Sequence, residues 1–393
     1  MKVLHVMNGP NWGGSYQLAA LLCAAQQRLG VDAQLCYLDG STSVAKAEAL
    51  GAKVLAFDNP QTNLSKWARW AGAERGYERI LHDFSPDVLC THLSLSHLLT
   101  DRIRKRVRRF VWIPHVHQPW TSFGHGPDSL RRPWLRHYLN FRHGLGDAWA
   151  TRAADRITTV SDYVRNSYAQ VGMSRSRTTT IYNGITLTDP ATLTDQRAAW
   201  RVPAGSRVIG ALGYFAPVKG FDLLISAFDR IAGSYPDAHL VIAGGDVGGD
   251  THFRETLTAQ RQASAFAERI HIVGGQRSGA DFMFNVDICA VPSLVEGFSL
   301  VLAEAMQFGK PGVVTSAGGC REVCRHEREG FVFESGNVRS LAGQLERLLA
   351  DRTLAATLGN AAATRIRAEF TLDHCARAHL AVYEQVTKET ARR

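Results

Sequence analysis

"VPSLVEGFSLVLAEAMQFGKP", residues 291–311, is the stretch that decides the fold of this chain. It opens at the end of an apolar strand and continues, after Glu296 and Gly297 in a loop, into an apolar helical run. The first amides of that helix have no internal acceptors, and with the helix dipole they form a site for an anion such as phosphate. Because Gly297 lacks a Cβ, the backbone can approach such a ligand closely.

Glu304 is the unusual residue of this stretch, because it falls within one helical turn of Leu300 and Val301 in apolar surroundings. A carboxylate there is partly desolvated and needs hydrogen-bond donors, which the two hydroxyls of a sugar diol can supply. Together these groups predict three neighbouring sites: Glu296 in the loop for a sugar, the free helix amides for a diphosphate, and Glu304 for a ribose. The alternative is that Glu296 is a solvated loop acid and that Glu304 pairs with a nearby base.

Strands, glycine-rich loops and amphipathic helices alternate along the rest of the chain. The first copy of the pattern begins with "KVLHVM" at residues 2–7, and the second with "RVIGALGYF" at residues 207–215. This alternation predicts an α/β protein with two Rossmann-like, doubly wound parallel sheets in tandem, whose ligands lie beyond the carboxyl ends of the strands. We expect domains at residues 1–188 and 207–370, a linker at 189–206, and a C-terminal helix at 371–393 that packs back toward the first domain.

The composition is that of a globular protein, with 45% apolar and 21% charged residues among 393. No apolar run approaches the roughly 20 residues that span a bilayer, and the N-terminal run is too short for a secretory signal. The seven cysteines are odd in number and scattered, which indicates reduced thiols in a cytoplasmic protein. The formal charge of +9 is compatible with nucleic acid, anionic membranes or phosphorylated ligands as partners.

The stretch at residues 291–311 resembles the signature of the retaining glycosyltransferases of family 4, in which two acids are separated by seven residues. "VKGFDLLISAF", "AHLVIAGG", "RIHIVGG", "DICAVPSL" and "AGGCREV" resemble the family in order and spacing, and "RITTVSDYVRNSY" resembles the end of its first domain. The resemblance implies the GT-B architecture, with two Rossmann-like domains facing a central cleft. It also implies transfer of a sugar from a nucleotide-diphosphate sugar, with UDP- or GDP-sugars as the expected donors.

The resemblance carries roles onto individual residues. Glu304 would bind the ribose hydroxyls, Glu296 would contact the donor sugar, and Lys219 would neutralise the diphosphate leaving group. The remaining donor contacts would be made by glycine loops, helix amides and the loop near the base: Gly13, Gly14, Gly275, Gln276, Gly297, Phe298, Ser299 and Leu300. No metal or other cofactor is expected, because no DxD-like acidic cluster follows a strand.

Two further positions correspond to a histidine and an arginine of the family. The family histidine near the reacting carbon corresponds to His115 or His117 in "WIPHVHQ"; both point to the same side of a strand, and we favour His117 because it is nearer the loop. Tyr214 stands where the family often has an arginine. A tyrosine carries no charge, so diphosphate stabilisation would depend more on Lys219.

The acceptor is not specified by these motifs. The segment from Asp101 would place four basic residues on one helical face: Arg102, Lys105, Arg106 and Arg109. Such a face predicts attachment to an anionic membrane. The expected acceptor is then a lipid-linked glycan, as in lipopolysaccharide or exopolysaccharide synthesis. The alternative for this segment is a solvated helix packed on core aromatics. Two other functions compete: a nucleotide-sugar epimerase or hydrolase of the same fold, and a non-catalytic protein that binds nucleotide sugar or nucleic acid. Against nucleic acid, no recognised binding module is present.

Overall fold

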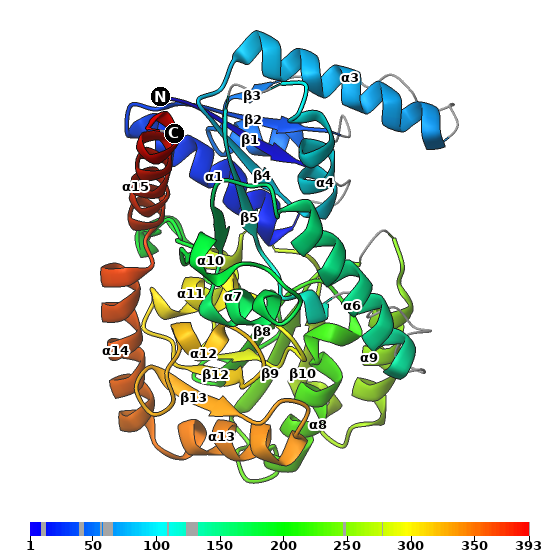
Figure 1. Cartoon of the computed structure of the whole chain (residues 1–393). Coiled ribbons are helices and arrows are strands. Elements are labelled where there is room, and N and C mark those ends of the chain that lie inside the picture. Colours follow the sequence, from blue (N-terminus) through cyan, green and yellow to red (C-terminus); the bar gives the residue numbers. More distant parts are fainter. Residues whose placement is uncertain are drawn as a thin grey trace. The chain divides into compact units, whose positions relative to one another are not determined.

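The structure is a computed structural model of the whole chain (Figure 1). It describes residues 1–8, 13–38, 43–55, 57, 66–107, 110–122, 133–246, 249–276 and 278–392, without the side chains of 66–71, 122 and 133–140. The chain divides into two compact units, one formed by residues 1–184 with 372–393 and the other by residues 185–371.

The first unit contains a seven-stranded parallel sheet in the order β3-β2-β1-β4-β5-β6-β7. Its strands are β1 (Lys2–Met7), β2 (Asp32–Tyr37), β3 (Val54–Leu55), β4 (Val88–His92), β5 (Val111–Val116), β6 (Ile157–Thr159) and β7 (Thr178–Thr180). Its helices are α1 (Gly14–Arg28), α2 (Val44–Ala49), α3 (Lys66–Phe84), α4 (Ser94–Ile103), α6 (Pro133–Ala150), α7 (Asp162–Ala169) and α15 (Leu372–Ala391), with short 3-10 turns at Trp120–Ser122 and Arg175–Arg177.

The second unit contains a six-stranded parallel sheet in the order β10-β9-β8-β11-β12-β13. Its strands are β8 (Arg207–Leu212), β9 (Ala238–Ala243), β10 (Ile270–Val273), β11 (Ile288–Val291), β12 (Gly312–Thr315) and β13 (Gly330–Phe333). Its helices are α8 (Phe221–Ile231), α9 (His252–Ala263), α10 (Gly279–Phe284), α11 (Leu300–Met306), α12 (Cys320–Val323), α13 (Val338–Ala350) and α14 (Arg352–Glu369), with 3-10 turns η3 (Pro190–Thr192), η4 (Pro217–Lys219) and η5 (Ala267–Arg269).

Both sheets are doubly wound, as predicted. In each unit the first strand lies in the interior of the sheet, the next two strands follow on one side, and the fourth begins the other side. The chain direction of the connections therefore reverses between β1 and β4 in the first unit, and between β8 and β11 in the second. Loops that leave neighbouring strands at such a switch point diverge, so ligands bind there in doubly wound proteins.

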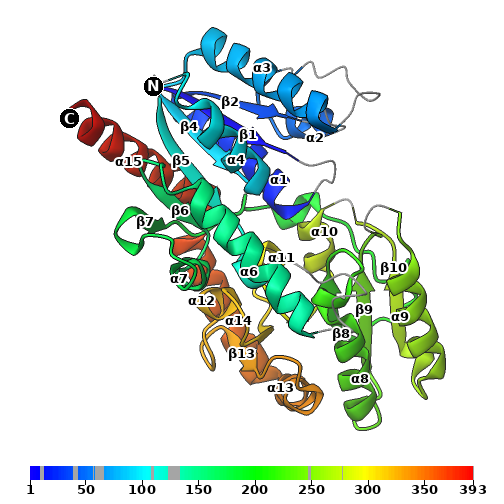
Figure 2. The same cartoon turned by 45° about the vertical axis from the view of Figure 1, so that its right-hand side comes forward.

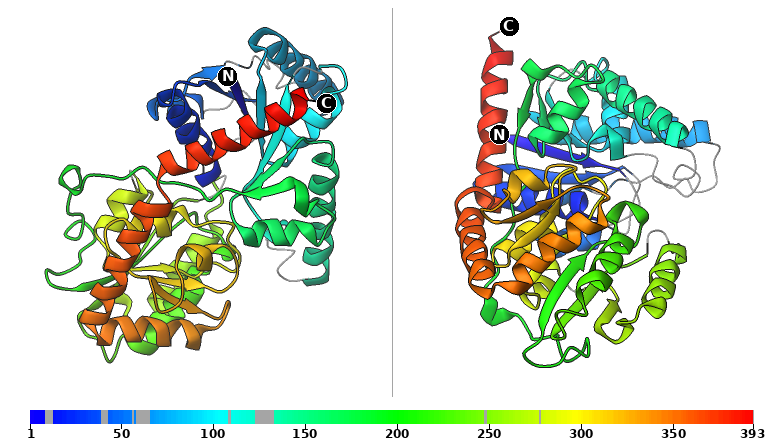
Figure 3. Two further views of the ribbon diagram at one scale, coloured as in Figure 1. Left: turned by 60° about the vertical axis from the view of Figure 1, so that its left-hand side comes forward. Right: turned by 90° about the horizontal axis from the view of Figure 1, so that it is seen from below.

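Helices bury their apolar faces against these sheets. Helix α8 shows this clearly, because Phe221, Leu224 and Phe228 are each at most 1% exposed. In the first unit every residue of β4 and β5 is buried, as expected for parallel strands covered by helices on both faces. Figure 3 (left) shows α15 lying along the first unit, where it packs against α1 and β5.

The expected linker at residues 189–206 is instead part of the second unit. The backbone amide of Gln196 donates to Asn285 Oδ1 at 2.9 Å, and Arg197 forms an ion pair of 3.0 Å with Asp287. The ring of Trp200 packs against that of Phe282, with centroids 5.0 Å apart. These contacts fix an irregular, mostly exposed segment to the second unit through a few side chains such as Trp200, so the absence of strand and helix patterns did not mark a free linker.

Candidate functional site

Three loops meet at the carboxyl ends of β8, β11 and β12. The amide of Leu294, in the loop after β11, donates to the carbonyl of Val218 at 2.8 Å, and the amide of Gly319 donates to the carbonyl of Glu296 at 3.0 Å. The loops can approach this closely because of two glycines with positive φ. A Cβ on Gly220 would lie 2.2 Å from the carbonyl oxygen of Pro292, and one on Gly318 would lie 2.1 Å from that of Glu296.

Lys219 and Glu296 form an ion pair at this junction. Lys219 Nζ lies 2.8 Å from Glu296 Oε2, and the two side chains are 18% and 11% exposed. Burial alone would lower the pKa of Lys219, but the charge of Glu296 outweighs it and the pKa is raised, so the lysine is cationic at neutral pH. Ser293 Oγ donates a second hydrogen bond of 3.2 Å to the same carboxylate oxygen. Glu296 is therefore not a solvated loop acid.

Tyr214 contacts this cation through its ring. Lys219 Nζ lies 5.1 Å from the ring centroid, and the tyrosine is 44% exposed. A ring in this position stabilises the ammonium by a cation–π interaction but adds no positive charge. Tyr214, which stands where the family often has an arginine, therefore adds no second positive charge beside Lys219.

The helix after this loop begins slightly later than expected. The N-cap of α11 is Ser299, whose Oγ accepts a hydrogen bond of 3.3 Å from the amide of Leu302. Phe298 is 6% exposed and its ring packs against Phe370, with centroids 5.9 Å apart. The side chain of Phe298 thus belongs to the core, and only backbone groups of Gly297 to Leu300 remain as the expected ligand contacts.

Glu304, on α11, lies directly against the start of α10. A Cβ added to Gly279 would be only 1.8 Å from Glu304 Oε2, so Gly279 provides the space for this carboxylate. Burial raises the pKa of Glu304 to about 7. Within the described residues, its carboxylate forms neither an ion pair nor a side-chain hydrogen bond, so the alternative of a nearby base as partner receives no support there.

The loop expected to meet the base follows β10. Gly275 is exposed and Gln276 is partly exposed, with Nε2 donating to the carbonyl of Gly274 at 2.8 Å. In the first unit, Gly13 is the N-cap of α1 and Gly14 is its first residue, and a Cβ at Gly13 would meet no atom within 4 Å. These residues lie where the sequence placed them, after β10 and β1, and their contact with a donor stays a prediction.

His115 and His117 lie at the carboxyl end of β5. His115 is fully buried and its Nδ1 is 2.8 Å from Thr158 Oγ1. His117 is 8% exposed, follows the last residue of β5, and its Nε2 is 2.8 Å from His92 Nδ1. Burial lowers the pKa of His117 to about 3, so its imidazole is neutral. The preference for His117 stays a prediction.

The predicted basic surface is not built as expected. Helix α4 ends at Ile103, so the bases after it do not continue one helical face. Arg102 and Arg106 form ion pairs of 2.7 and 3.0 Å with Glu74 of α3, which neutralises much of their charge. Arg109 lies outside the described residues. The expectation that these bases share one helical face is wrong for the described residues, because α4 ends before Lys105 and Arg106, and the acidic partner 28 residues before Arg102 could not be assigned from sequence.

Sequence reasoning missed the glycines that shape the site, Gly220, Gly279 and Gly318, and the side chain of Ser293. Their signal was present as glycine or serine in the loops that follow the strands. Such residues are common in every loop of an α/β protein, and only the neighbouring atoms single them out.

The fold belongs to the GT-B class, as the resemblance implied. The crystal structure of Anabaena HepE in complex with UDP and glucose superposes with a TM-score of 0.83 at 20% identity, covering 98% of this chain and 99% of that one. The apo form of the lipopolysaccharide outer core galactosyltransferase WaaB superposes with a TM-score of 0.72 at 17% identity, covering 98% and 100%.

Two family models match most of the chain. Glycosyltransferase Family 4 matches residues 12–189, and Glycosyl transferases group 1 matches residues 194–365. The chain therefore belongs to the family 4 type of glycosyltransferases.

Curated relatives match over part of their length. The D-inositol 3-phosphate glycosyltransferase of Jonesia denitrificans is 33% identical over 199 residues, which are 48% of this chain and 46% of that protein. The lipopolysaccharide core biosynthesis mannosyltransferase LpsB of Rhizobium meliloti is 27% identical over 202 residues, which are 51% and 57%. The chain thus spans about half the length of these two relatives. None of the described helices is long and apolar enough to cross a membrane.

Proposed function

We propose that this protein transfers a sugar from a nucleotide-diphosphate sugar to an acceptor hydroxyl, with retention of configuration at the anomeric carbon. The observation that carries the proposal is the Lys219–Glu296 pair, which lies at the switch point between β8 and β11. A cation held there by a carboxylate is placed to meet the phosphates of a bound nucleotide. The carboxylate of Glu304, which has no ion pair among the described residues, is the complementary group for a ribose diol.

The chemistry assigned to these groups is stabilisation of the leaving group. The bond between the anomeric carbon and the diphosphate oxygen breaks, the acceptor oxygen bonds to that carbon, and the leaving phosphate takes the acceptor's proton. Lys219 and the amides near Gly297 supply positive charge that needs no reorganisation during the reaction. The proposal needs no metal ion or further cofactor for this step. Glu296 is held by Lys219 and Ser293, which supports a binding role for it in place of a nucleophilic one.

The donor is tested first by thermal unfolding of the purified chain with UDP, GDP, ADP and CMP in parallel. A ligand at a hundred times its dissociation constant stabilises the folded state by about 2.7 kcal/mol. We expect one of UDP and GDP to raise the midpoint, UDP being the nucleotide bound in the HepE crystal structure. If none of the four nucleotides raises it, the proposed donor site is wrong.

The reaction class is tested by product analysis with the matching nucleotide sugar. A retaining transferase forms a glycoside with the donor's anomeric configuration only when an acceptor is present. An epimerase or hydrolase releases epimer or free sugar without one, and a binding protein leaves the nucleotide sugar intact. Release of epimer or sugar as the main product would replace the proposal by the second enzyme class.

We propose a membrane-bound glycan lipid as the acceptor, for lipopolysaccharide, exopolysaccharide or another glycoconjugate. The supporting surface is α6, which packs beside α4 (Figure 2). Three large apolar side chains of α6 recur every fourth residue and are exposed: Phe141 by 42%, Leu145 by 42% and Trp149 by 53%. Arg152 places its guanidinium 3.8 Å over the Trp149 ring. An exposed apolar stripe edged by an arginine suits the interface of an anionic bilayer.

Changing Leu145 and Trp149 of α6 together to glutamate is expected to weaken binding to phosphatidylglycerol vesicles at low salt by tenfold or more. The change removes two apolar groups from the lipid interface and adds two negative charges that the surface repels. Vesicle sedimentation measures it. Leu187→Glu is the matched control, since Leu187 is 45% exposed in the other unit and its variant should bind like the wild type. Equal binding of all three proteins would remove α6 from the proposal.

A further inference from the structure

Five histidines and one cysteine gather in the interior of the first unit, and the proposed sugar transfer uses at most one of them. The sheet register brings them together. His5 of β1 is opposite Cys90 of β4, and His92 of β4 is opposite His115 of β5. His379 of α15 joins from outside the sheet, with its ring centroid 4.8 Å from that of His115. These five residues are fully buried, and His117 at the end of β5 completes the group.

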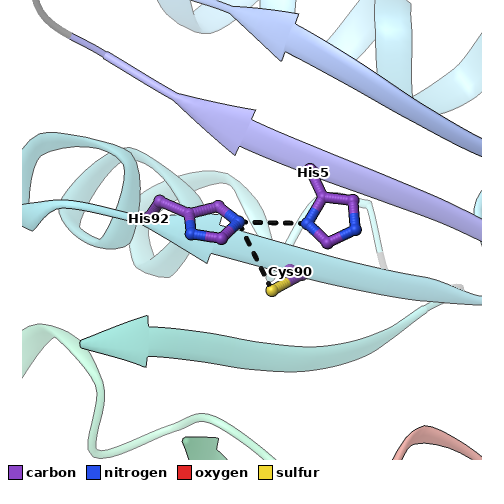
Figure 4. A group of neighbouring side chains, drawn as sticks. All are labelled: His5, Cys90 and His92. Atoms are coloured by element: carbon purple, nitrogen blue, oxygen red, sulfur yellow. Dashed lines mark hydrogen bonds between the residues drawn. The ribbon is translucent and has the colours of Figure 1, made fainter. Parts of the chain in front are cut away.

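Three ligand atoms of this group converge on one point (Figure 4). His5 Nδ1 lies 3.0 Å from His92 Nε2, and Cys90 Sγ lies 3.7 Å from the same His92 nitrogen. All three atoms are within 4.8 Å of one another. The two nitrogens face each other, so a proton between them is shared by one ring donating to the other. A cation that takes the place of that proton would be bound by both lone pairs and by the thiolate.

The geometry is close to that of a metal centre. With metal–nitrogen bonds of about 2.0–2.1 Å, two imidazole ligands place their nitrogens roughly 3.3–3.6 Å apart. The imidazoles would thus need to separate by only a few tenths of an ångström from their present 3.0 Å. This is a smaller change than a rotamer flip would produce.

The outer nitrogens of both imidazoles are already held. His5 Nε2 is 2.9 Å from Gln26 Oε1, and His92 Nδ1 is 2.8 Å from His117 Nε2. If each ligand ring donates its outer N–H to these acceptors, Nδ1 of His5 and Nε2 of His92 are left as free lone pairs. Metal-binding histidines are oriented in this way by hydrogen bonds of their second nitrogen.

A second observation concerns two neighbouring histidines of the same cluster. Among the described residues, His115 Nε2 and His379 Nε2 are buried without a hydrogen-bond partner. Buried polar atoms are nearly always satisfied, so two unsatisfied imidazole nitrogens in one cluster are unusual. Both belong to the histidine cluster that surrounds the three convergent atoms.

We propose that His5, Cys90 and His92 bind one soft metal cation, Cu(I) in preference to Zn(II). A thiolate and imidazoles are the ligands that both ions accept. On binding, the Cys90 thiol loses its proton to solvent, so the site carries one negative charge and two neutral rings. Cu(I) makes this buried site neutral, whereas Zn(II) would leave a net positive charge in it, which is costly away from water. The ion would tie β1 to β4, and the proposal does not rest on the proposed sugar transfer.

The test is the copper content of the full-length chain, produced in copper-supplemented medium and purified without oxygen. We expect about one copper per chain, retained against a chromophoric Cu(I) chelator, with one sulfur and two nitrogens around it in X-ray absorption. Cys90→Ser and Cys90→Ala should each retain less than about a tenth of this copper. Cys23→Ser is the matched control, because Cys23 is equally buried in the same unit and lies on α1.

Thermal unfolding of each variant without metal shows whether it folds, and Cys90→Ala, which buries no hydroxyl, serves if the serine variant does not. Copper that is absent from the wild type, or that is retained equally by the folded Cys90 variants, would overturn the proposal. Zinc found in place of copper with the same dependence on Cys90 would keep the site and overturn the preference for Cu(I). None of these measurements involves a sugar donor, so their failure is separate from failure of the proposed transferase.

Discussion

Replacing Lys219 by alanine is expected to lower kcat for sugar transfer by about 100- to 1,000-fold, the range seen when one preorganised group at a developing charge is removed. The reason is the position of its ammonium, held by Glu296 at 2.8 Å beside the loop at the carboxyl end of β11. Tyr214 gives no second positive charge to take over. Steady-state kinetics with the donor found by thermal unfolding measure the effect, and KM for the acceptor should change little.

The control for this prediction is Lys310→Ala, which removes the other lysine of the second unit, in the turn between α11 and β12. It should keep kcat within about twofold of the wild type, because it is not part of the junction of the three loops. Lys219→Ala also leaves Glu296 without its ion pair, at a cost of about 1–3 kcal/mol of unfolding free energy. Assays are therefore run well below the midpoint of the variant. Unchanged turnover in a folded Lys219→Ala protein would contradict the assigned role.

Replacing Glu304 by glutamine is expected to stabilise the free protein at pH 8 and to weaken its nucleotide binding. Burial raises the pKa of Glu304 from 4.5 to about 7. Below pH 4.5 the group is protonated in both the folded and the unfolded chain, and its ionisation costs nothing. As pH rises to about 7, only the unfolded chain releases the proton, so stability falls, and above about pH 7 the cost is constant at about 3 kcal/mol.

Glutamine has no charge to desolvate and removes that cost, so the gain should approach about 3 kcal/mol near pH 8 and shrink to roughly 1 kcal/mol near pH 5. In the same variant, a charged hydrogen bond to the ribose is lost, and affinity should fall about 10- to 100-fold. Thermal unfolding with and without the nucleotide, at both pH values, measures the two effects together.

Glu346→Gln, on the exposed side of α13, is the comparison for Glu304→Gln and should show neither change. A variant that gains stability but keeps full nucleotide affinity would confirm the buried carboxyl and exclude it as the ribose ligand. A variant without the gain at the higher pH would mean that Glu304 is paired in solution.

Much of the fold could be predicted from short-range pattern. Strand-length apolar runs that end in glycine or serine, with helices such as residues 221–231 between them, predict parallel sheets because buried strands and one-sided helices have different periods. The same pattern placed Lys219 and Glu296 after strands, and so at the same edge of a sheet. It failed where a segment has little regular structure yet is held to a unit by a few side-chain contacts, as at residues 189–206.

By itself, the sequence determined the class of this protein: two doubly wound units, with acids and a lysine at the carboxyl ends of the second sheet. Only the tertiary structure decided which of these groups meet. Lys219 and Glu296 are 77 residues apart and become a pair because β8 and β11 are neighbours. Likewise His5 and His92 are 87 residues apart and are joined only by the register of β1 on β4. Local periodicity records which face of an element is buried, but strand order and register, which set these distances, depend on contacts between remote segments.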